Sequence, residues 1–198
     1  MKSFQEAVEN RRSIYALGKE NRVSKEKIND LVNFAVLHTP SAFNSQSARI
    51  VVLHDTDSSK LWNLTRGVLR KIVPADAFES TEAKLTSFDS GYGTILFFED
   101  QNVVNDLMKN FPLYKDNFPV WSLESNGMLQ FVIWTSLATE GIGASLQHYN
   151  PLIDADVKKT WDIPESWKLL AEMPFGTIAA PAGDKEYIPT VERVRIFG

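Results

Sequence analysis

The chain has 198 residues, of which 43% are hydrophobic and 23% are charged; these values are typical of a globular protein with a sizeable core, and we expect one domain over residues 1–198. There is no cysteine, which excludes disulfides, zinc–thiolate sites and iron–sulfur clusters. The formal net charge of -4 argues against nucleic acid as the main partner. No apolar run could cross a membrane and the N-terminus does not resemble a signal peptide, so we expect a cytoplasmic protein without membrane insertion.

Two helices are predicted at the start of the chain. The first has a capping box from Ser3 to Glu6 and runs into Arg11-Arg12-Ser13. Arginines at a helix C-terminus complement the helix dipole, and their position alone favours this structural interpretation. Arginine with serine also suits a phosphate group, which is the functional interpretation. The second helix is expected to begin after Ser24 and to end near His38, because Pro40 disfavours helix at the residue before it.

A polar loop follows, over residues 39–49, before an apolar run at 50–54 that we expect to form a strand. The loop has no carboxylate and no glycine, but it is rich in neutral donors and acceptors: Ser41, Asn44, Ser45, Gln46 and Ser47. Such a set suits recognition of the edge of a flat polar heterocycle. An ordinary connection between helix and strand accounts for it equally well.

The middle of the chain reads as a helix with apolar residues from 61 to 72, a polar segment, a strand at 94–98 and a short helix over about 103–111. The next segment is aromatic, with Phe111, Tyr114, Phe118 and Trp121. Two interpretations remain open for it: a hydrophobic clip packed on the core, or a lid or wall over a substrate pocket.

The longest predicted helix covers residues 123–140 and is apolar around nearly its whole circumference, which favours burial at a subunit interface. Gly141 suits the position after its end. We then expect a strand at 144–148, a helix at about 154–161, and a last strand broken at Met173-Pro174-Phe175. The tail, 191–196, alternates like a strand, which would place Arg193 and Arg195 on one face. Strands that alternate with helices indicate an α/β or α+β protein with one mixed sheet.

Several catalytic motifs are absent. Gly91-Tyr92-Gly93 and Gly141-Ile142-Gly143 both lack the third glycine of a dinucleotide fingerprint, and there is no phosphate-loop lysine motif or nucleophile elbow. The three histidines lie far apart in the sequence, so we expect no metal site. Since no nucleophile is paired with a base, an enzyme of this sequence would depend on a cofactor.

Taken together, four segments resemble the flavin-dependent nitroreductase family, in the right order and over nearly the whole chain. They are Arg11-Arg12-Ser13, Pro40-Ser41-x-x-Asn44-Ser45-Gln46, Gly141-Ile142-Gly143 followed by 147–151, and the pair Arg193 and Arg195. Segments 93–100 and 174–176 resemble the short subgroup of fatty-acid-response and stress nitroreductases. The resemblance implies an α+β fold with three layers, a mixed central sheet flanked by helices, and a homodimer.

The resemblance also implies an FMN site at the dimer interface. In such folds Arg11, Ser13, Arg193 and Arg195 hold the phosphate, and Arg12 contacts the phosphate, or the ribityl chain and flavin edge. Pro40, Ser41 and Asn44 come from the partner subunit, and Gln46 reaches the ribityl or phosphate part. Leu146 and Gln147 lie beside the reactive N5 edge, and Lys84 contacts the pyrimidine edge. No catalytic acid or base and no metal ligand is implied.

The activity implied is that of an NAD(P)H oxidoreductase. NAD(P)H delivers hydride to flavin N5 and leaves, and a nitroaromatic, quinone or activated enone then occupies the same space, which gives ping-pong kinetics. Ser47 and Ala48 depart from the proline and aromatic residue often found there, and Gln147 stands where many members have an acid. The first departure motivates the alternative, a flavin-binding redox or lipid-response regulatory protein with little turnover.

Overall fold

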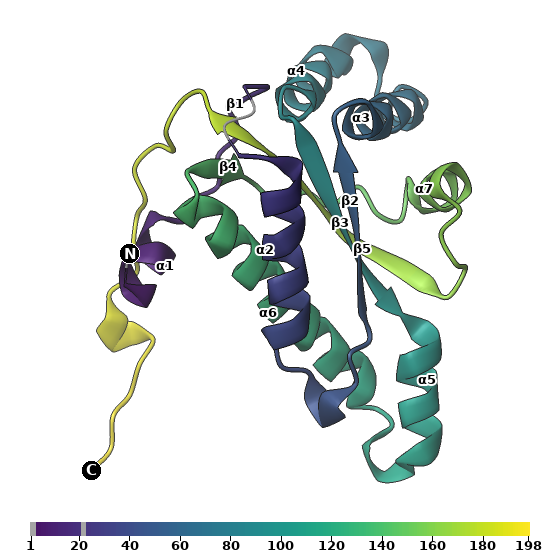
Figure 1. The fold of residues 1–198 in the computed structure, drawn as a ribbon, viewed down its shortest axis with the longest axis vertical. Helices are drawn as coiled ribbons and strands as arrows, with labels where there is room; N and C mark the ends of the chain where they lie inside the picture. Colours follow the sequence, from purple (N-terminus) through teal and green to yellow (C-terminus); the bar gives the residue numbers. More distant parts are fainter. Residues whose placement is uncertain (1–2, 21–22) are drawn as a thin grey trace.

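One antiparallel sheet forms the centre of the molecule (Figure 1). The computed structural model describes residues 3–20 and 23–198. The strands run in the order β1-β5-β3-β2, and β4 also pairs with β5. Their bounds are β1 (Leu17–Gly18), β2 (Ala48–His54), β3 (Gly93–Asp100), β4 (Ile142–Ala144) and β5 (Trp167–Ile178). All of these strand pairs are antiparallel, and the parallel part of the expected mixed sheet is the isolated bridge between Ser13 and Ala144.

Helices cover both faces of the sheet, which confirms the α+β class with three layers. Figure 1 shows α2 (Lys25–His38) and α6 (Phe118–Thr139) on one side, and α3 (Thr56–Leu69), α4 (Phe78–Asp89) and α7 (Asp154–Trp161) on the other. Side chains alternate along a strand, so Ile95 and Phe97 of β3 belong to the first core while Leu96 and Phe98 belong to the second. α1 (Phe4–Asn10) packs on α6, and α5 (Gln101–Asn110) directly follows β3.

Local signals located several helix ends correctly. Ser3 and Glu6 form the expected capping box, and the Ser24 side chain accepts a hydrogen bond from the Lys27 N–H. α2 ends at His38, before the extended Thr39. Gly141 has a φ of 76°, the left-handed conformation that favours glycine after a helix. Among the described residues, the helices are too short or too polar to span a bilayer.

The longest helix, α6, begins at Phe118 and not at the expected residue 123, and four other expectations about elements were wrong. β5 is continuous through Pro174, which lies opposite Thr94, because proline loses only its N–H and its φ is close enough to that of a strand. β4 ends at Ala144, and only a single bridge at Gln147 continues the pairing toward 148. The polar segment before Ser90 contains α4, whose only buried side chains are Leu85 and Phe88, too few to give a helical pattern.

The fourth concerns the tail. Residues 180–198 belong to no strand; they form one short 3-10 turn, η4 (Thr190–Glu192), and nearly all of them are exposed. In Figure 1 this segment runs away from the sheet to the C-terminus. The alternating pattern of residues 191–196 therefore does not correspond to a strand, because a strand needs a partner and this segment pairs with none of the five strands.

Candidate functional site

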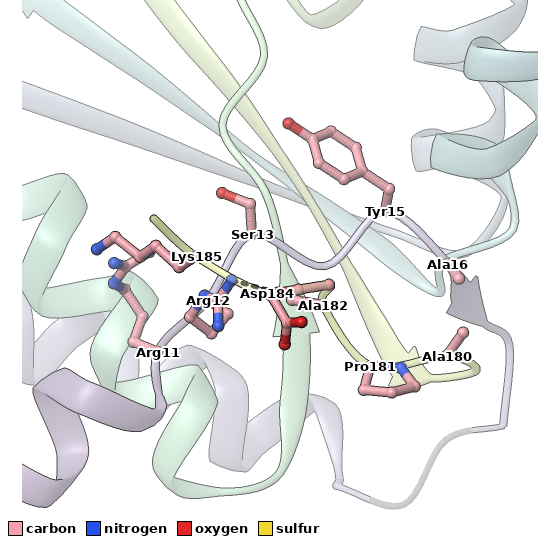
Figure 2. Close-up of a pocket in the computed structure, with 11 residues that line it drawn as sticks. Arg11, Arg12, Ser13, Tyr15, Ala16, Ala180, Pro181, Ala182, Asp184 and Lys185 are labelled. Carbon is pink, nitrogen blue, oxygen red and sulfur yellow. Dashed lines mark hydrogen bonds between the residues drawn. The ribbon is translucent and has the colours of Figure 1, made fainter. Parts of the chain in front are cut away.

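A basic cavity lies between the end of α1 and the segment that follows β5 (Figure 2). Its volume is about 520 Å³, and its lining brings together two ends of the chain: Arg11, Arg12, Ser13, Tyr15, Ala16 and residues 180–185. Arg12 Nη2 donates a hydrogen bond of 2.7 Å to the Gly183 carbonyl, which ties the two segments together. Three cations, Arg11, Arg12 and Lys185, against one acid, Asp184, make this cavity suitable for an anion.

Arg11 lines this cavity, and one of its donors has no acceptor. Its guanidinium lies over the indole of Trp134, 4.4 Å from the ring centroid. Its Nε atom is buried and has no hydrogen-bond partner. Burial, and to a lesser degree the charge of Arg12, lowers the pKa of Arg11. Because buried donors are normally satisfied, an orphaned guanidinium N–H in a basic cavity fits a phosphate oxygen as its acceptor.

Ser13 reaches the cavity through its pairing with β4. It bridges Ala144, and the Ile14 N–H donates to the Ala144 carbonyl at 2.9 Å. This approach needs a glycine at position 143, where a Cβ atom would lie 2.9 Å from the Ile14 side chain. The bridge places Ser13 beside Ala144, which directly precedes the segment of Leu146 and Gln147.

The segment after β4 is held on β5. Gln147 and Glu172 exchange two backbone hydrogen bonds, of 2.7 and 2.9 Å. The Gln147 side chain donates to the hydroxyl of the buried Ser145 at 3.0 Å. Leu146 packs against the core on the α6 side. These contacts give both residues a defined position before any ligand binds.

The polar loop at residues 40–47 is also well ordered. The Ser41 hydroxyl accepts from the Gln46 N–H at 3.0 Å, and Arg49 Nη1 donates to the Gln46 carbonyl at 2.7 Å. Phe43, Asn44 and Gln46 all have positive φ, a strained conformation for residues other than glycine, which surrounding contacts must maintain and which is often found at functional sites. With α6 the loop lines a cavity of about 430 Å³: Pro40, Ser41, Ala42, Phe43, Trp121, Glu124, Ser125 and Met128.

The aromatic segment packs directly on this loop. The Phe43 ring lies 5.0 Å from Phe111, 5.2 Å from Phe118 and 6.0 Å from Trp121, measured between centroids. Trp121 also lines the cavity beside the loop. Residues 111–121 are therefore a clip on Phe43, and the end of the clip is also a wall of the cavity. Phe43 is a site candidate that the sequence analysis missed, because its position in the loop carries no signal of its aromatic neighbours.

A buried carboxyl group lies below the loop. Glu99 of β3 is 1% exposed, and its Oε2 accepts a hydrogen bond of 3.0 Å from Asn126 of α6. Burial raises the pKa of Glu99, while hydrogen bonds with Ser47 and Asn126 act in the opposite direction. Ser47 is buried and its hydroxyl lies 3.3 Å from that of Ser45. Ser47, one of the departures from the family pattern, thus belongs to the support of the loop.

A single chain does not bring all the predicted site residues together. Arg11, Arg12 and Ser13 line one cavity, whereas Pro40 and Ser41 line cavities at the far end of α2, and the exposed Asn44 and Gln46 belong to the same loop. Lys84 is exposed on α4, which packs on the opposite face of the sheet from α6. Arg193 and Arg195 are exposed in the segment that leaves the body of the chain (Figure 1).

The cavity and its support include residues that the sequence analysis missed. Gly183 and Lys185, which follow β5, line the cavity, and Trp134 of α6 does not line it but contacts Arg11. The contact between Arg12 and Gly183 spans 171 positions of sequence. No local pattern predicts such a contact, and the only available signal was a lysine in a polar segment that follows the last strand.

The fold is that of solved nitroreductases, which are oxidoreductases. Nitroreductase CinD from Lactococcus lactis is 45% identical in its complex with chloramphenicol and 46% identical in its complex with 4-nitrophenol; each superposes with a TM-score of 0.91 and covers 99% of this chain and 100% of that one. A curated relative, the putative nitroreductase HBN1 of Saccharomyces cerevisiae, is 36% identical over 90% of this chain and 89% of its own length.

The family model points the same way. The Nitroreductase family model matches residues 8–177, so the chain belongs to the Nitroreductase family. The match begins just before Arg11-Arg12-Ser13 and ends within β5, and it therefore covers the loop at 40–47 and the segment after β4.

Proposed function

We propose that this protein is an FMN-dependent NAD(P)H oxidoreductase of the nitroreductase type that acts as a homodimer. The observation that carries the proposal is the buried Arg11 Nε without an acceptor, in a cavity lined by three cations, in a chain of this family. A phosphate group would satisfy that donor and balance the local charge. When bound, FMN would supply a two-electron carrier that takes hydride from NAD(P)H at N5 and passes it to an acceptor in ping-pong half-reactions.

The protein's own residues bind and orient in this proposal. Arg11, Arg12 and Ser13 hold the phosphate, joined by Lys185, which the sequence analysis had not included. Leu146 and Gln147 lie beside the reactive edge of the flavin, in a segment that is fixed on β5. Charge-assisted hydrogen bonds contribute about 1.5–3 kcal/mol each, so a few of them hold a cofactor without a covalent bond.

A second subunit completes the site. Within one chain the arginines and the polar loop line separate cavities, so Pro40, Ser41, Asn44 and Gln46 would reach the flavin from the partner. Apolar side chains are exposed on α2 and α6, namely Phe34, Leu37, Leu123 and Met128, and on the tail, namely Val191, Val194, Ile196 and Phe197. Patches of this kind mark interfaces. In this arrangement Arg193 and Arg195 would reach the FMN phosphate only when the two subunits associate.

The acceptor would be a small aromatic molecule, a quinone or a related enone. The cavity between the loop and α6 is mostly apolar and has an aromatic wall, Phe43 and Trp121, as sites for flat aromatic ligands commonly have. The solved complexes of CinD contain chloramphenicol and 4-nitrophenol, both nitroaromatic compounds. Lys84 keeps its proposed role toward the pyrimidine edge, and we propose no catalytic acid or base.

The test has two stages. The purified protein is first examined by visible spectroscopy and titrated with FMN, and we expect a yellow protein or saturable binding with about one FMN per chain. Steady-state oxidation of NADH and NADPH is then followed with a quinone and with 4-nitrophenol, and we expect parallel lines in double-reciprocal plots, as ping-pong kinetics requires. A colourless protein that binds no added FMN would refute the proposal. Reduction by NAD(P)H without reoxidation by any acceptor would instead support the regulatory alternative.

A further inference from the structure

Trp134 contacts two residues that shape the basic cavity, Arg11 and Ala144. It projects from α6, and its ring face lies 4.4 Å from the guanidinium carbon of Arg11. Its Nε1–H donates a hydrogen bond of 3.2 Å to the Ala144 carbonyl. The hydrogen bond fixes the edge of the indole, and one ring face carries the Arg11 guanidinium.

The Ala144 carbonyl links three segments of the chain through hydrogen bonds. It accepts from Trp134 of α6 and also from the Ile14 N–H at 2.9 Å, and Ala144 itself belongs to β4. The bond from Ile14 fixes the neighbouring Ser13, and the bond from Trp134 fixes the surface on which Arg11 rests. One carbonyl therefore sets the relative positions of Arg11 and Ser13.

Arg11 needs this surface because its environment is otherwise unfavourable. Its Nε is buried without a partner, and Arg12, the next residue in the chain, repels it. A cation over an indole face is attracted by the ring quadrupole, most strongly where water is excluded. The planar guanidinium also stacks on the ring in a way that a lysine ammonium does not reproduce.

We propose that Trp134 is a positioning residue for the phosphate of the cofactor: it holds the Arg11 guanidinium, in register with Ser13, in the orientation that binds a phosphate monoester. This inference rests on the proposed function and deepens it. Trp134 acts through Arg11 and contacts no part of the flavin ring in this proposal. Its effect is therefore specific to ligands that carry the phosphate.

Comparison of FMN with riboflavin, which lacks the phosphate, tests this directly. Dissociation constants for both ligands are measured by flavin fluorescence for the wild type, Trp134→Phe, Trp134→Leu and the control Trp161→Leu. The control removes a tryptophan that faces Lys60 at 5.8 Å, on a different helix and outside the cavity. We expect Trp134→Leu to weaken FMN binding about tenfold and Trp134→Phe, which keeps a ring face, only about two- to threefold. Riboflavin binding should change less than about twofold in all variants.

A double-mutant cycle with Arg11→Lys isolates the pair. Arg11→Lys alone should weaken FMN binding, and in the Trp134→Leu background it should add little, because the stacked geometry is already lost. If Trp134→Leu does not fold, the cycle is run with Trp134→Phe. Because this variant weakens FMN binding less, we expect a smaller but measurable coupling between positions 134 and 11.

The outcomes separate the two proposals. A wild-type protein that binds FMN no better than riboflavin would refute the phosphate site and hence the proposed function. A wild-type preference for FMN that persists in Trp134→Leu, an equal loss for both flavins, or additive effects in the cycle would refute the positioning role alone.

Discussion

Glu172 is joined to the backbone of Tyr149 by a hydrogen bond of 2.9 Å in the interior of the protein, where the Tyr149 N–H donates to Glu172 Oε2. Glu172 is fully buried, and its other carboxyl oxygen has no partner. Burial raises the pKa of Glu172 to about 8, against the effect of the bond from Tyr149, and the charge of Asp154 raises it further. The same residue pairs with Gln147, so an uncharged acid supports the segment proposed to lie beside the flavin.

This pKa predicts how stability depends on pH. The folded-state pKa of Glu172 lies above the ordinary glutamate value, so between about pH 4.5 and pH 8 the folded state binds more protons than the unfolded state. The contribution of Glu172 to stability is thus complete below about pH 4.5 and is lost as pH rises toward 8, at up to about 1.4 kcal/mol per pH unit. Glu172→Gln keeps an uncharged side chain and should remove this dependence. Urea unfolding of both proteins from pH 5.5 to 8.5 measures it, and parallel curves would contradict the prediction.

Asn126 provides a second test, of the core below the loop. Its Nδ2 atom donates to both the Phe98 carbonyl and Glu99 Oε2, each at 3.0 Å. Asn126→Leu leaves two buried acceptors without a donor and should lower the free energy of unfolding by about 2–3 kcal/mol. Gln130→Leu is the matched control, because Gln130 makes only one bond, to Asn126 Oδ1, and is partly exposed. If both variants lose the same free energy of unfolding in denaturant, the bonds to Glu99 and Phe98 contribute no more to stability than the single bond of Gln130.

Arg49 should matter more for the ligand than for the fold. Its guanidinium donates to the Gln46 carbonyl and forms an ion pair of 3.1 Å with Asp100, so it fixes the end of the polar loop on β3. Arg49→Met keeps the apolar stem and removes these bonds. We expect FMN affinity to fall about tenfold while the melting temperature falls by only a few degrees. Arg66→Met is the control, since Arg66 pairs with Glu82 outside the candidate site. A loss of stability without a loss of affinity would assign Arg49 a purely structural role.

The effect of the arginines near the two chain ends on FMN binding can be separated from their effect on stability in the same way. Arg11→Ala combined with Arg195→Ala should weaken FMN binding by a hundredfold or more, since each charge-assisted contact contributes about 1.5–3 kcal/mol. Arg195 is exposed in the tail, and its removal should not affect unfolding of the isolated chain. Isothermal titration and thermal unfolding are compared on the same samples. Equal effects on binding and on unfolding would favour a structural role for these arginines.

Mixed dimers test whether two subunits share each site. Arg11→Ala and Asn44→Leu act on residues that line separate regions of one chain. Each variant alone should bind FMN poorly. After unfolding and refolding together, half of the dimers combine the two chains, and each of these has one intact site, so about a quarter of all sites should bind FMN with normal affinity. If both residues acted within one chain, mixing would restore nothing, and titration of the mixture distinguishes the results.

The sequence by itself determined features that depend on neighbours in the chain. Ser3 and Ser24 begin helices because their side chains reach the next free N–H groups, and Gly141 ends α6 because it tolerates a positive φ. The family resemblance placed Arg11, Arg12 and Ser13 on one ligand, and they do line one cavity. The alternation of strand and helix patterns indicated an α/β or α+β protein, and the family resemblance selected the α+β class.

Only the tertiary structure decided features that depend on distant partners. Gly183 contacts Arg12, Lys185 lines the same cavity, Trp134 contacts Arg11, and four aromatic rings contact Phe43. Pro174 stays inside β5 because it pairs with Thr94 of β3 on one side, while β4 ends opposite Phe175 on the other, and the tail forms no strand because it pairs with none of the five strands. Local propensity acts over a few residues, whereas these contacts join segments far apart in the chain, so the packing of the whole sheet had to position them.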